Sequence, residues 1–177
     1  ARCAYIARLQ PVACSIYDGL SGGREQLAIS YRFAAEGMTA DRETLVSQLR
    51  EALQNRRKEE LAAGCTLIGP HRDDLEVTIG GLPARSFGSQ GQQRSAVLAL
   101  KLAEASVLRE VTGEQPVALL DDVMSELDVS RQDYILNHIH GWQVFITCCE
   151  PSAVMRLAGG RTFHIQNGAV ATENDHG

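Results

Sequence analysis

The short segment Val117–Asp122 limits the fold of this chain most, because an apolar run ends there abruptly in two carboxylates. A short apolar run between polar residues predicts a strand buried on both faces, which is typical of parallel sheets. Ligands of α/β proteins bind in the crevice at the carboxyl ends of such strands. Asp121 and Asp122 therefore predict an α/β fold with a ligand site at this edge of the sheet.

The two carboxylates have distinct expected roles. Asp121 is expected to hold Mg²⁺, directly or through water, because a hard dication prefers oxygen ligands and phosphate bridging. Asp122 is expected to orient or deprotonate an attacking water, as the catalytic residue. The alternative is a strand that simply ends in a polar turn, and the segment taken alone does not decide between these interpretations.

A second candidate site lies at Gly88–Arg94, where a long Ala- and Leu-rich helix is predicted to begin and to run from Gln90 to about Val111. Free backbone amides at a helix start, a serine hydroxyl and a glycine that permits close approach suit a phosphate group. The candidate phosphate-binding residues are Ser89, Gln90, Gly91 and Gln92. The alternative is an ordinary helix cap by Ser89, which this segment favours when it is taken alone.

Periodic and alternating patterns along the rest of the chain predict further elements. The expected helices cover residues 1–17, 41–63 and 130–140, and the expected strands cover 27–33, 75–79 and 144–147. Turns are expected at Asp18-Gly19, at Ser21–Gly23 and at Gly80-Gly81, which leads towards Phe87, and a hairpin over 161–172 turns at Asn167-Gly168. The predicted architecture is α/β: a mixed or parallel sheet with flanking helices, a helical lobe and a terminal β-hairpin.

Composition argues against several classes of protein. The net charge is −5, whereas a charge-driven nucleic-acid binder is usually basic. The five cysteines, an odd number without a CxxC spacing, argue against a disulfide framework or a zinc site and favour free thiols in a reducing cytoplasm. No apolar run approaches the roughly 18 residues of a membrane span, and no secretory signal is visible. We therefore expect a cytoplasmic protein with no membrane partner.

The candidate segments stand in an ordered series. Gly88–Arg94 opens a helix, the acidic strand Val117–Asp122 follows, and Ser125–Asp128 comes directly after it. This series resembles the signature motif, the Walker B motif and the D-loop of ABC-type ATPases. The matching D-loop residues are Ser125, Glu126 and Asp128. The resemblance favours a nucleotide site over a polar turn and an ordinary cap.

Variant residues narrow the resemblance further. Gly88 and Gln90 replace the Leu and the first Gly of the commonest signature form, and Asp122 stands where most ABC proteins carry Glu. Together with Gly69–Leu75 upstream, whose role does not follow from its residues, these variants are similar to the RecF recombination-mediator family. The resemblance covers nearly the whole chain and is most specific over Gly69–Asp128.

A second glycine loop, Leu20–Arg24, looks more like the common signature than Gly88–Arg94 does. The segment that follows it alternates like a strand and is not a clear helix. No apolar strand that ends in acidic residues comes after it at the distance expected between a signature motif and a Walker B motif. Because the chemistry of the signature needs backbone amides at a helix start, we interpret Ser21–Gly23 as a turn.

The resemblance implies a partial ABC-ATPase head that corresponds to roughly the carboxy-terminal half of a RecF-like protein. Residues 1–68 would form a helical lobe segment with one strand pair, and residues 69–177 the carboxy-terminal ATPase subdomain. The implied cofactors are ATP and Mg²⁺. The implied partners are a second copy in an ATP-bound homodimer, where Ser89 and Gly91 reach the nucleotide of the other subunit, DNA at single-strand gaps, and the RecO and RecR proteins.

Two parts of a complete ATPase site are absent from the sequence. Neither Lys58 nor Lys101 lies in a Gly-Lys-Ser/Thr phosphate loop, so the chain by itself is expected to be inactive. Cys148 stands where ABC proteins usually carry a switch histidine, which leaves Thr147 as the candidate phosphate sensor. Two alternatives stay open: a non-catalytic protein-interaction module, and a head of the SMC sort in which the helix Asp41–Ala63 is the stub of a coiled coil.

Overall fold

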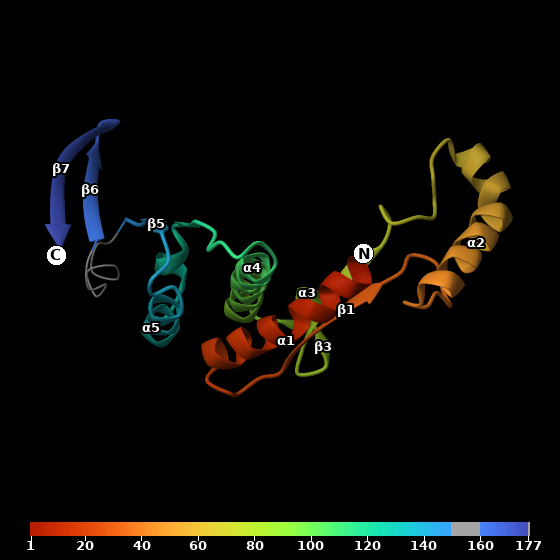
Figure 1. The fold of residues 1–177 in the computed structure, drawn as a ribbon, viewed down its shortest axis with the longest axis horizontal. Coiled ribbons are helices and arrows are strands. Elements are labelled where there is room, and N and C mark those ends of the chain that lie inside the picture. The colour runs from red at the N-terminus through yellow and green to blue at the C-terminus, as the bar shows by residue number, and fades with distance from the viewer. Residues whose placement is uncertain (150–159, 177) are drawn as a thin grey trace. The chain divides into compact units, whose positions relative to one another are not determined.

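The computed structural model describes residues 1–149 and 160–176, with the backbone alone for 172–176 (Figure 1). The chain divides into two compact units, Ala1–Val107 and Leu108–Gly177. The boundary between these units falls within a helix, and each unit is considered by itself. The 68/69 division expected from the family resemblance concerns subdomains of a larger head and stays a prediction.

The first unit combines long helices with a small antiparallel sheet. Its elements are α1 (Arg2–Ser21), β1 (Leu27–Arg32), α2 (Arg42–Ala63), β2 (Asp74–Ile79), β3 (Leu82–Pro83), α3 (Ala84–Phe87) and α4 (Gln90–Thr112), which crosses the boundary. The sheet order is β1-β2-β3, and Leu27 of β1 pairs with Ile79 of β2. The predicted alternation of β1 is confirmed, because Leu27 and Ile29 are buried while Ala28 is exposed.

Helix α1 lies against β1 and supplies much of the core of this unit (Figure 1). Its buried residues recur at helical spacing and include Leu9, Ala13, Ile16 and Leu20. The turn predicted at Asp18-Gly19 is wrong, since both residues are helical. The helix ends instead at Gly22, whose φ of 65° is left-handed and suits a glycine. Packing of the apolar face against the sheet therefore outweighs the helix-breaking tendency of an internal glycine.

Two further segments of this unit test the predicted boundaries. The helix expected over 41–63 is confirmed as α2, which begins after the cap Asp41 and ends before Gly64. The hairpin turn expected at Gly80-Gly81 is confirmed, because β2 pairs with β3 in an antiparallel arrangement; β3 ends at Pro83, and the short helix α3 leads from there to Phe87. Proline has no amide proton to donate to a sheet ladder, and it is favoured at helix starts.

The second unit contains a parallel strand pair and a separate hairpin. Its elements are β4 (Ala118–Asp121), the 3₁₀ turn η1 (Val123–Glu126), α5 (Val129–His138), β5 (Val144–Thr147), β6 (Gly160–Gln166) and β7 (Ala169–His176). β4 pairs with β5 in parallel, and β6 pairs with β7 in an antiparallel hairpin about Asn167-Gly168. The α/β class, the parallel pair and the terminal hairpin are as predicted.

The prediction that β4 and β5 are buried on both faces is wrong. Leu120 is buried, but Leu119 is 75% exposed and its register partner Phe145 is 58% exposed. The pair has only two strands, and nothing in the described part of the chain covers its second face. The strands are therefore apolar enough for double burial but are buried on one face only.

Gln132 of α5 holds η1 in place. Its side chain is one of the few buried polar groups, with 8% exposure of the residue. The amide Nε2 donates to the carbonyl oxygens of Met124 at 2.8 Å and Leu127 at 3.0 Å. One side chain thus satisfies two carbonyl groups of the turn that joins β4 to α5.

We expect Gln132→Met to lower the free energy of unfolding of the second unit by about 1–3 kcal/mol, because two buried carbonyl oxygens lose their donor. Urea unfolding followed by the fluorescence of Trp142, the single tryptophan of the chain, measures this change within the same unit. Asn137→Met, at an exposed position of the same helix, is the matched control. Equal stability of the two variants would contradict the role of Gln132.

Candidate functional site

The carboxyl end of β4 brings two predicted site residues together. The parallel register places Asp121 opposite Thr147 of β5. The Thr147 hydroxyl donates to Asp121 Oδ1 at 2.5 Å, and the Asp122 backbone N–H donates to Thr147 Oγ1 at 3.0 Å and to Thr147 O at 3.1 Å. Thr147 therefore uses its hydroxyl as a donor to one predicted site residue and as an acceptor from the other.

The chain turns sharply at Asp122, directly after the strand. The residue has φ 52° and ψ 17°, a left-handed conformation that is uncommon outside glycine but tolerated by aspartate. Its N–H is held by Thr147, and its carbonyl oxygen accepts the Ser125 hydroxyl at 2.8 Å. Hydrogen bonds on both sides of the residue thus hold this turn, so Asp121 ends the strand while Asp122 occupies the N-cap position of η1.

The acidic residues suit a hard cation that shares its ligands with a phosphate. Asp121 and Asp122 are both exposed at the strand end. The described residues contain no cluster of three or more His, Cys, Asp or Glu side chains that would form a complete metal cage. Mg²⁺ is usually held by one or two carboxylates, with phosphate oxygens and water completing the octahedron. A site of Asp121 and Asp122 at an open sheet edge fits this chemistry.

Cys148 follows Thr147 at the position of the usual switch histidine. Burial raises the pKa of its thiol above the ordinary value of 9.0, and the nearby Cys149 and Asp122 raise it further. The thiol is therefore protonated and uncharged at neutral pH. It provides neither an imidazole nor a thiolate beside the acidic strand end.

In the first unit, Ser89 caps α4 through a reciprocal pair of hydrogen bonds. Gln92 N donates to Ser89 Oγ at 3.3 Å, and Ser89 N donates to Gln92 Oε1 at 2.7 Å. This arrangement is a capping box, in which a serine and a glutamine three residues later satisfy each other's amides. The ordinary cap does not use up the hydroxyl, because Ser89 Oγ accepts from Gln92 N and, among the described residues, donates to no acceptor.

Gly88 is required by a close approach of the backbone. A Cβ atom at this position would lie 2.6 Å from the carbonyl oxygen of Ala84, which is too short for any side chain. Gln93 Nε2 donates to the Gly88 carbonyl oxygen at 2.9 Å. The glycine that replaces the Leu of the common signature therefore packs directly on α3, while Gln93 secures it from α4.

The glycine loop at Leu20–Arg24 is the carboxyl end of α1. Gly22 N and Gly23 N donate to carbonyl oxygens of the last helical turn, and Arg24 Nε donates to Ser21 O at 2.7 Å. A helix end presents carbonyl oxygens, which repel phosphate. The interpretation as a turn is confirmed for Gly22-Gly23, while Ser21 is the last residue of α1.

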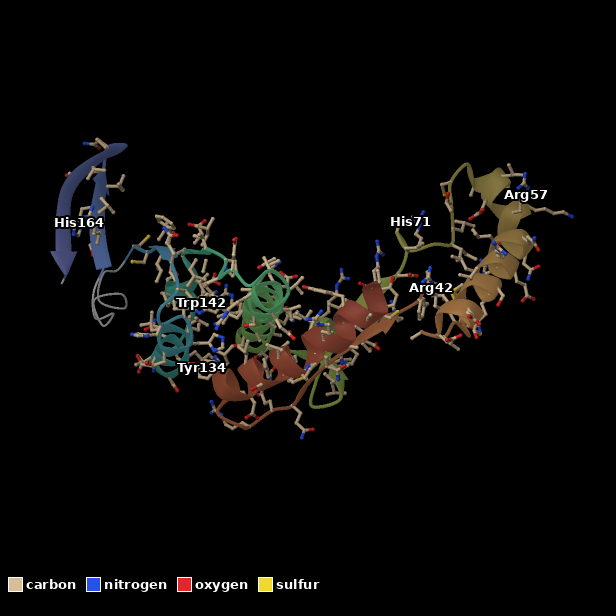
Figure 2. The ribbon with its side chains drawn as sticks, viewed as in Figure 1. Arg42, Arg57, His71, Tyr134, Trp142 and His164 are labelled. Atoms are coloured by element: carbon tan, nitrogen blue, oxygen red, sulfur yellow. The ribbon has the colours of Figure 1, made fainter. Side chains whose placement is uncertain are left out.

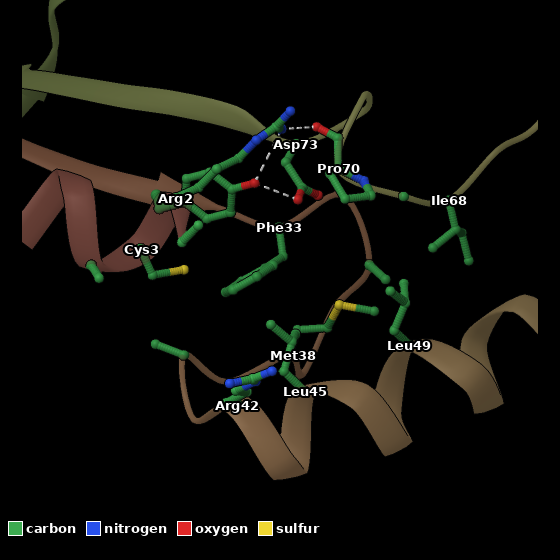
Figure 3. A pocket seen from close by; sticks show the side chains of 16 residues that line it. Arg2, Cys3, Phe33, Met38, Arg42, Leu45, Leu49, Ile68, Pro70 and Asp73 are labelled. Atoms are coloured by element: carbon green, nitrogen blue, oxygen red, sulfur yellow. Dashed lines mark hydrogen bonds between the residues drawn. The ribbon is translucent and has the colours of Figure 1, made fainter.

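The segment Gly69–Leu75 borders a cavity of about 540 Å³ in the first unit (Figure 3). Asp73 accepts the Tyr31 hydroxyl at 2.6 Å and the Ala34 backbone N–H at 2.8 Å, and Arg2 donates to the Pro70 carbonyl oxygen. The apolar part of the lining comes from both sides of the cavity and includes Phe33, Met38, Leu45, Leu49 and Ile68. In the structure this segment joins the start of α1 to the end of β1, which is a structural role.

Of the remaining predicted D-loop residues, Glu126 is the last residue of η1, and Asp128 lies directly before α5. Asp128 caps this helix by accepting from Arg131 N at 3.1 Å, and its carboxylate pairs with the Arg131 guanidinium at 3.1 Å.

Tyr134 and Trp142, labelled in Figure 2, flank His138 in a ring contact on each side. Burial lowers the pKa of His138, so this imidazole belongs to the packing of the second unit.

The structure places the predicted residues in two groups. Asp121, Asp122, Ser125 and Thr147 are linked by hydrogen bonds in the second unit, and Ser89 to Gln92 form the helix cap in the first. Glu25, which accepts from Gln92 Nε2 at 2.7 Å, contacts the predicted cap and was missed by the sequence analysis. No local pattern identifies it, because its contact spans 67 residues.

Comparison with known proteins finds relatives over nearly the whole chain. It is 44% identical over 174 residues to the DNA replication and repair protein RecF of Heliobacterium modesticaldum, which covers 96% of this chain and 46% of that protein. It is 39% identical over 172 residues to the RecF protein of Clostridium acetobutylicum, with the same two coverages. The chain thus spans about half the length of the curated relatives it matches. No protein-family model matches the chain.

Solved structures give the same result. The recombination mediator protein RecF-ATP in the RecFOR pathway matches with a TM-score of 0.78 and 36% identity, over 98% of this chain and 45% of that one. A structure from work on ATP-driven dimerization and DNA-stimulated activation of SMC ATPases matches with a TM-score of 0.59 and 11% identity, over 98% and 86% of the two chains. This second likeness shows the fold alone, and the predicted ABC-ATPase head fold is confirmed. No helix of the described residues is long and apolar enough to span a bilayer.

We expect Thr147→Val to speed hydrogen exchange of the Asp122 amide by about fivefold, because one of its two acceptors contributes roughly 1 kcal/mol. Amide exchange followed by NMR measures this directly. Thr112→Val removes a hydroxyl bonded to Leu108 O at 2.9 Å in the same unit and should leave the Asp122 amide unchanged. Unchanged exchange in both variants would show that Thr147 does not hold the strand end.

Proposed function

Since the chain belongs to the RecF family, in which it matches the carboxy-terminal part, we propose that it supplies the signature, Walker B and D-loop residues of an ABC-type ATPase. The observation that carries the proposal is the hydrogen-bonded end of β4, where Asp121 and Asp122 are both linked to Thr147. The cap of α4 at Ser89, whose hydroxyl donates to no acceptor among the described residues, supports the signature role.

The roles proposed for the acidic residues follow from their chemistry. Asp121 holds Mg²⁺ through a carboxylate oxygen that Thr147 does not use. Asp122 orients the attacking water and accepts its proton while the bond between the β- and γ-phosphates breaks. Bound Mg²⁺ contributes charge stabilisation on the phosphate oxygens. The D-loop residues Ser125, Glu126 and Asp128 keep this segment in position beside the strand end.

The signature residues act on a second nucleotide. We assign Ser89, Gln90, Gly91 and Gln92 to the γ-phosphate held by another copy of the protein. In the described part of the chain the Gln90 and Gly91 amides donate to no acceptor, so the first turn of α4 keeps donors for an anion. ATP then joins two copies, and the functional unit is an ATP-bound homodimer.

The phosphate loop comes from the rest of the protein in this proposal. The curated relatives are about twice as long as this chain, and Gly-Lys-Ser/Thr is absent from its sequence. The exposed apolar pair Leu119 and Phe145 on β4 and β5 supports a further layer of protein on that face. We place the Walker A motif in this additional part.

The family resemblance extends the proposal to DNA repair. The relatives are named DNA replication and repair proteins, and one matching structure is described as part of the RecFOR pathway. We propose that the complete protein recognises DNA at single-strand gaps and helps to load recombinase together with RecO and RecR. The net charge of −5 indicates that this half does not bind DNA through bulk charge alone.

We expect no ATP turnover by the 177-residue chain, because it has no phosphate-loop lysine. A protein of the full family length that includes this chain should turn over ATP in the presence of Mg²⁺, because in the proposal it also contains that lysine. Release of inorganic phosphate measures both. Asp122→Asn in the family-length protein should reduce turnover by at least about a hundredfold, as expected for the loss of a general base. Robust turnover by the short chain would contradict the proposal.

Two substitutions in the family-length protein separate the proposed cis and trans roles. Ser89→Arg should abolish ATP-dependent dimerisation, because a bulky cation replaces the hydroxyl that caps α4 and faces the second copy in the proposal. Asp122→Asn should instead trap the nucleotide-bound dimer, since binding persists while hydrolysis stops. Sedimentation velocity with and without Mg-ATP measures both states. A non-catalytic interaction module predicts no effect of nucleotide on either variant.

A further inference from the structure

Glu25 lies outside every motif of the sequence, yet its side chain contacts the signature helix. Its carboxylate accepts two hydrogen bonds of 2.7 Å: the Tyr17 hydroxyl donates to Oε2, and Gln92 Nε2 donates to Oε1. Tyr17 belongs to α1 and is only 1% exposed. Glu25 is half-buried and therefore joins the core of the first unit to the start of α4.

The carboxylate determines which way the Gln92 amide faces. An ionised carboxylate offers only acceptors, so Gln92 must present its NH₂ group to Glu25. The Gln92 Oε1 atom is then turned towards Ser89, whose backbone N–H donates to it at 2.7 Å. A reversed amide would place two donors against each other at Ser89 and at the same time turn Oε1 towards the carboxylate. Glu25 and the Ser89 N–H thus require the same direction of the Gln92 amide, and Glu25 holds that amide from the core side.

The cap also holds the Ser89 hydroxyl in place. Gln92 N donates to Ser89 Oγ at 3.3 Å, so the oxygen acts as an acceptor inside the cap. Among the described residues the Ser89 hydroxyl donates to no acceptor, and the Gln90 and Gly91 amides beside it donate to none either. Preorganised donors of this kind stabilise anions because they need no rearrangement when the anion binds.

We propose that Glu25 is a positioning residue of the signature loop. Held by Tyr17, its carboxylate anchors the Gln92 side chain and so stabilises the cap from which the Ser89 hydroxyl would donate to the γ-phosphate bound by a second copy. This inference rests on the proposed function of Ser89. The glycine turn at Ser21–Arg24 thereby acquires a role, since it carries the chain from the end of α1 to Glu25 without itself contacting phosphate.

The negative charge of Glu25 is compatible with a nearby phosphate. Each of its oxygens accepts a hydrogen bond, and Gln92 stands between the carboxylate and Ser89. Glu25 therefore acts on the nucleotide through Gln92 and not by contact. Its substitution should change the trans contact and leave nucleotide binding by the Walker motifs of the same subunit intact.

Glu25→Gln in the family-length protein tests the inference at nearly constant volume. A carboxylate accepts from both Tyr17 and Gln92, whereas an amide has one oxygen and can accept fully from only one of them, and it carries no charge, so the Gln92 side chain is held less firmly and the cap loosens. We expect the dissociation constant of the Mg-ATP-bound dimer to rise about tenfold, the effect of one well-placed hydrogen bond. Sedimentation velocity measures this constant, and binding of a fluorescent ATP analogue to dilute monomer should be unchanged.

The control is Glu51→Gln, which removes the same charge from an exposed position of α2 and should change neither quantity. Tyr17→Phe provides a second test: it releases the carboxylate while the ring stays in the core, and it should weaken the dimer in the same direction. Failure of the unsubstituted protein to dimerise with Mg-ATP would refute the proposed function itself. If that protein dimerises, and Glu25→Gln and Tyr17→Phe dimerise as tightly as Glu51→Gln, the role of Glu25 is overturned.

Discussion

The parallel register of β4 and β5 is the constraint on which the chemistry of the second unit depends. It sets Asp121 opposite Thr147, so the two residues meet at the carboxyl end of both strands. A slip by one residue would turn every side chain to the other face of the sheet. It would remove Leu120 from the core and bring a different residue to the strand end. The same strand register therefore both buries Leu120 and places Asp121 opposite Thr147.

Local sequence patterns were sufficient to predict most helices and strands, and they failed where contacts between distant parts of the chain determine the structure. The strand over 144–147 and the helix ended by Gly64 follow from features within a few residues of each boundary. The helix that continues through Asp18-Gly19 depends instead on packing against β1. Glu25 was beyond reach for the same reason, since its partner Gln92 lies in another element. The acidic strand and the cap were found because each is a continuous segment.

The incorrect prediction that β4 and β5 are buried on both faces is itself informative. The apolar composition of a strand reflects every layer that packs on it in the complete protein, whereas the structure shows only the layers this chain contains. Leu119 and Phe145 are register partners on one face, so their exposure forms a patch and is not scattered. Paired apolar residues in water are unfavourable by roughly 1.5–3 kcal/mol each relative to burial. A sequence that keeps them is consistent with the longer relatives.

The two half-sites use hydroxyl groups in opposite ways. Ser89 accepts within its cap, which leaves its proton for a ligand. Thr147 also accepts a hydrogen bond from a backbone amide, but its proton is already donated to Asp121.

A hydroxyl has one proton, so Thr147 can donate to a phosphate only after it releases Asp121. Any sensing by Thr147 is therefore coupled to the carboxylate assigned to Mg²⁺. Cys148 offers no charged alternative to Thr147, because burial raises the pKa of its thiol and keeps the thiol protonated. In the proposed function, detection of the γ-phosphate and coordination of the cation would then be a single event at the end of β4, and the cap at Ser89 would serve the nucleotide of a second copy.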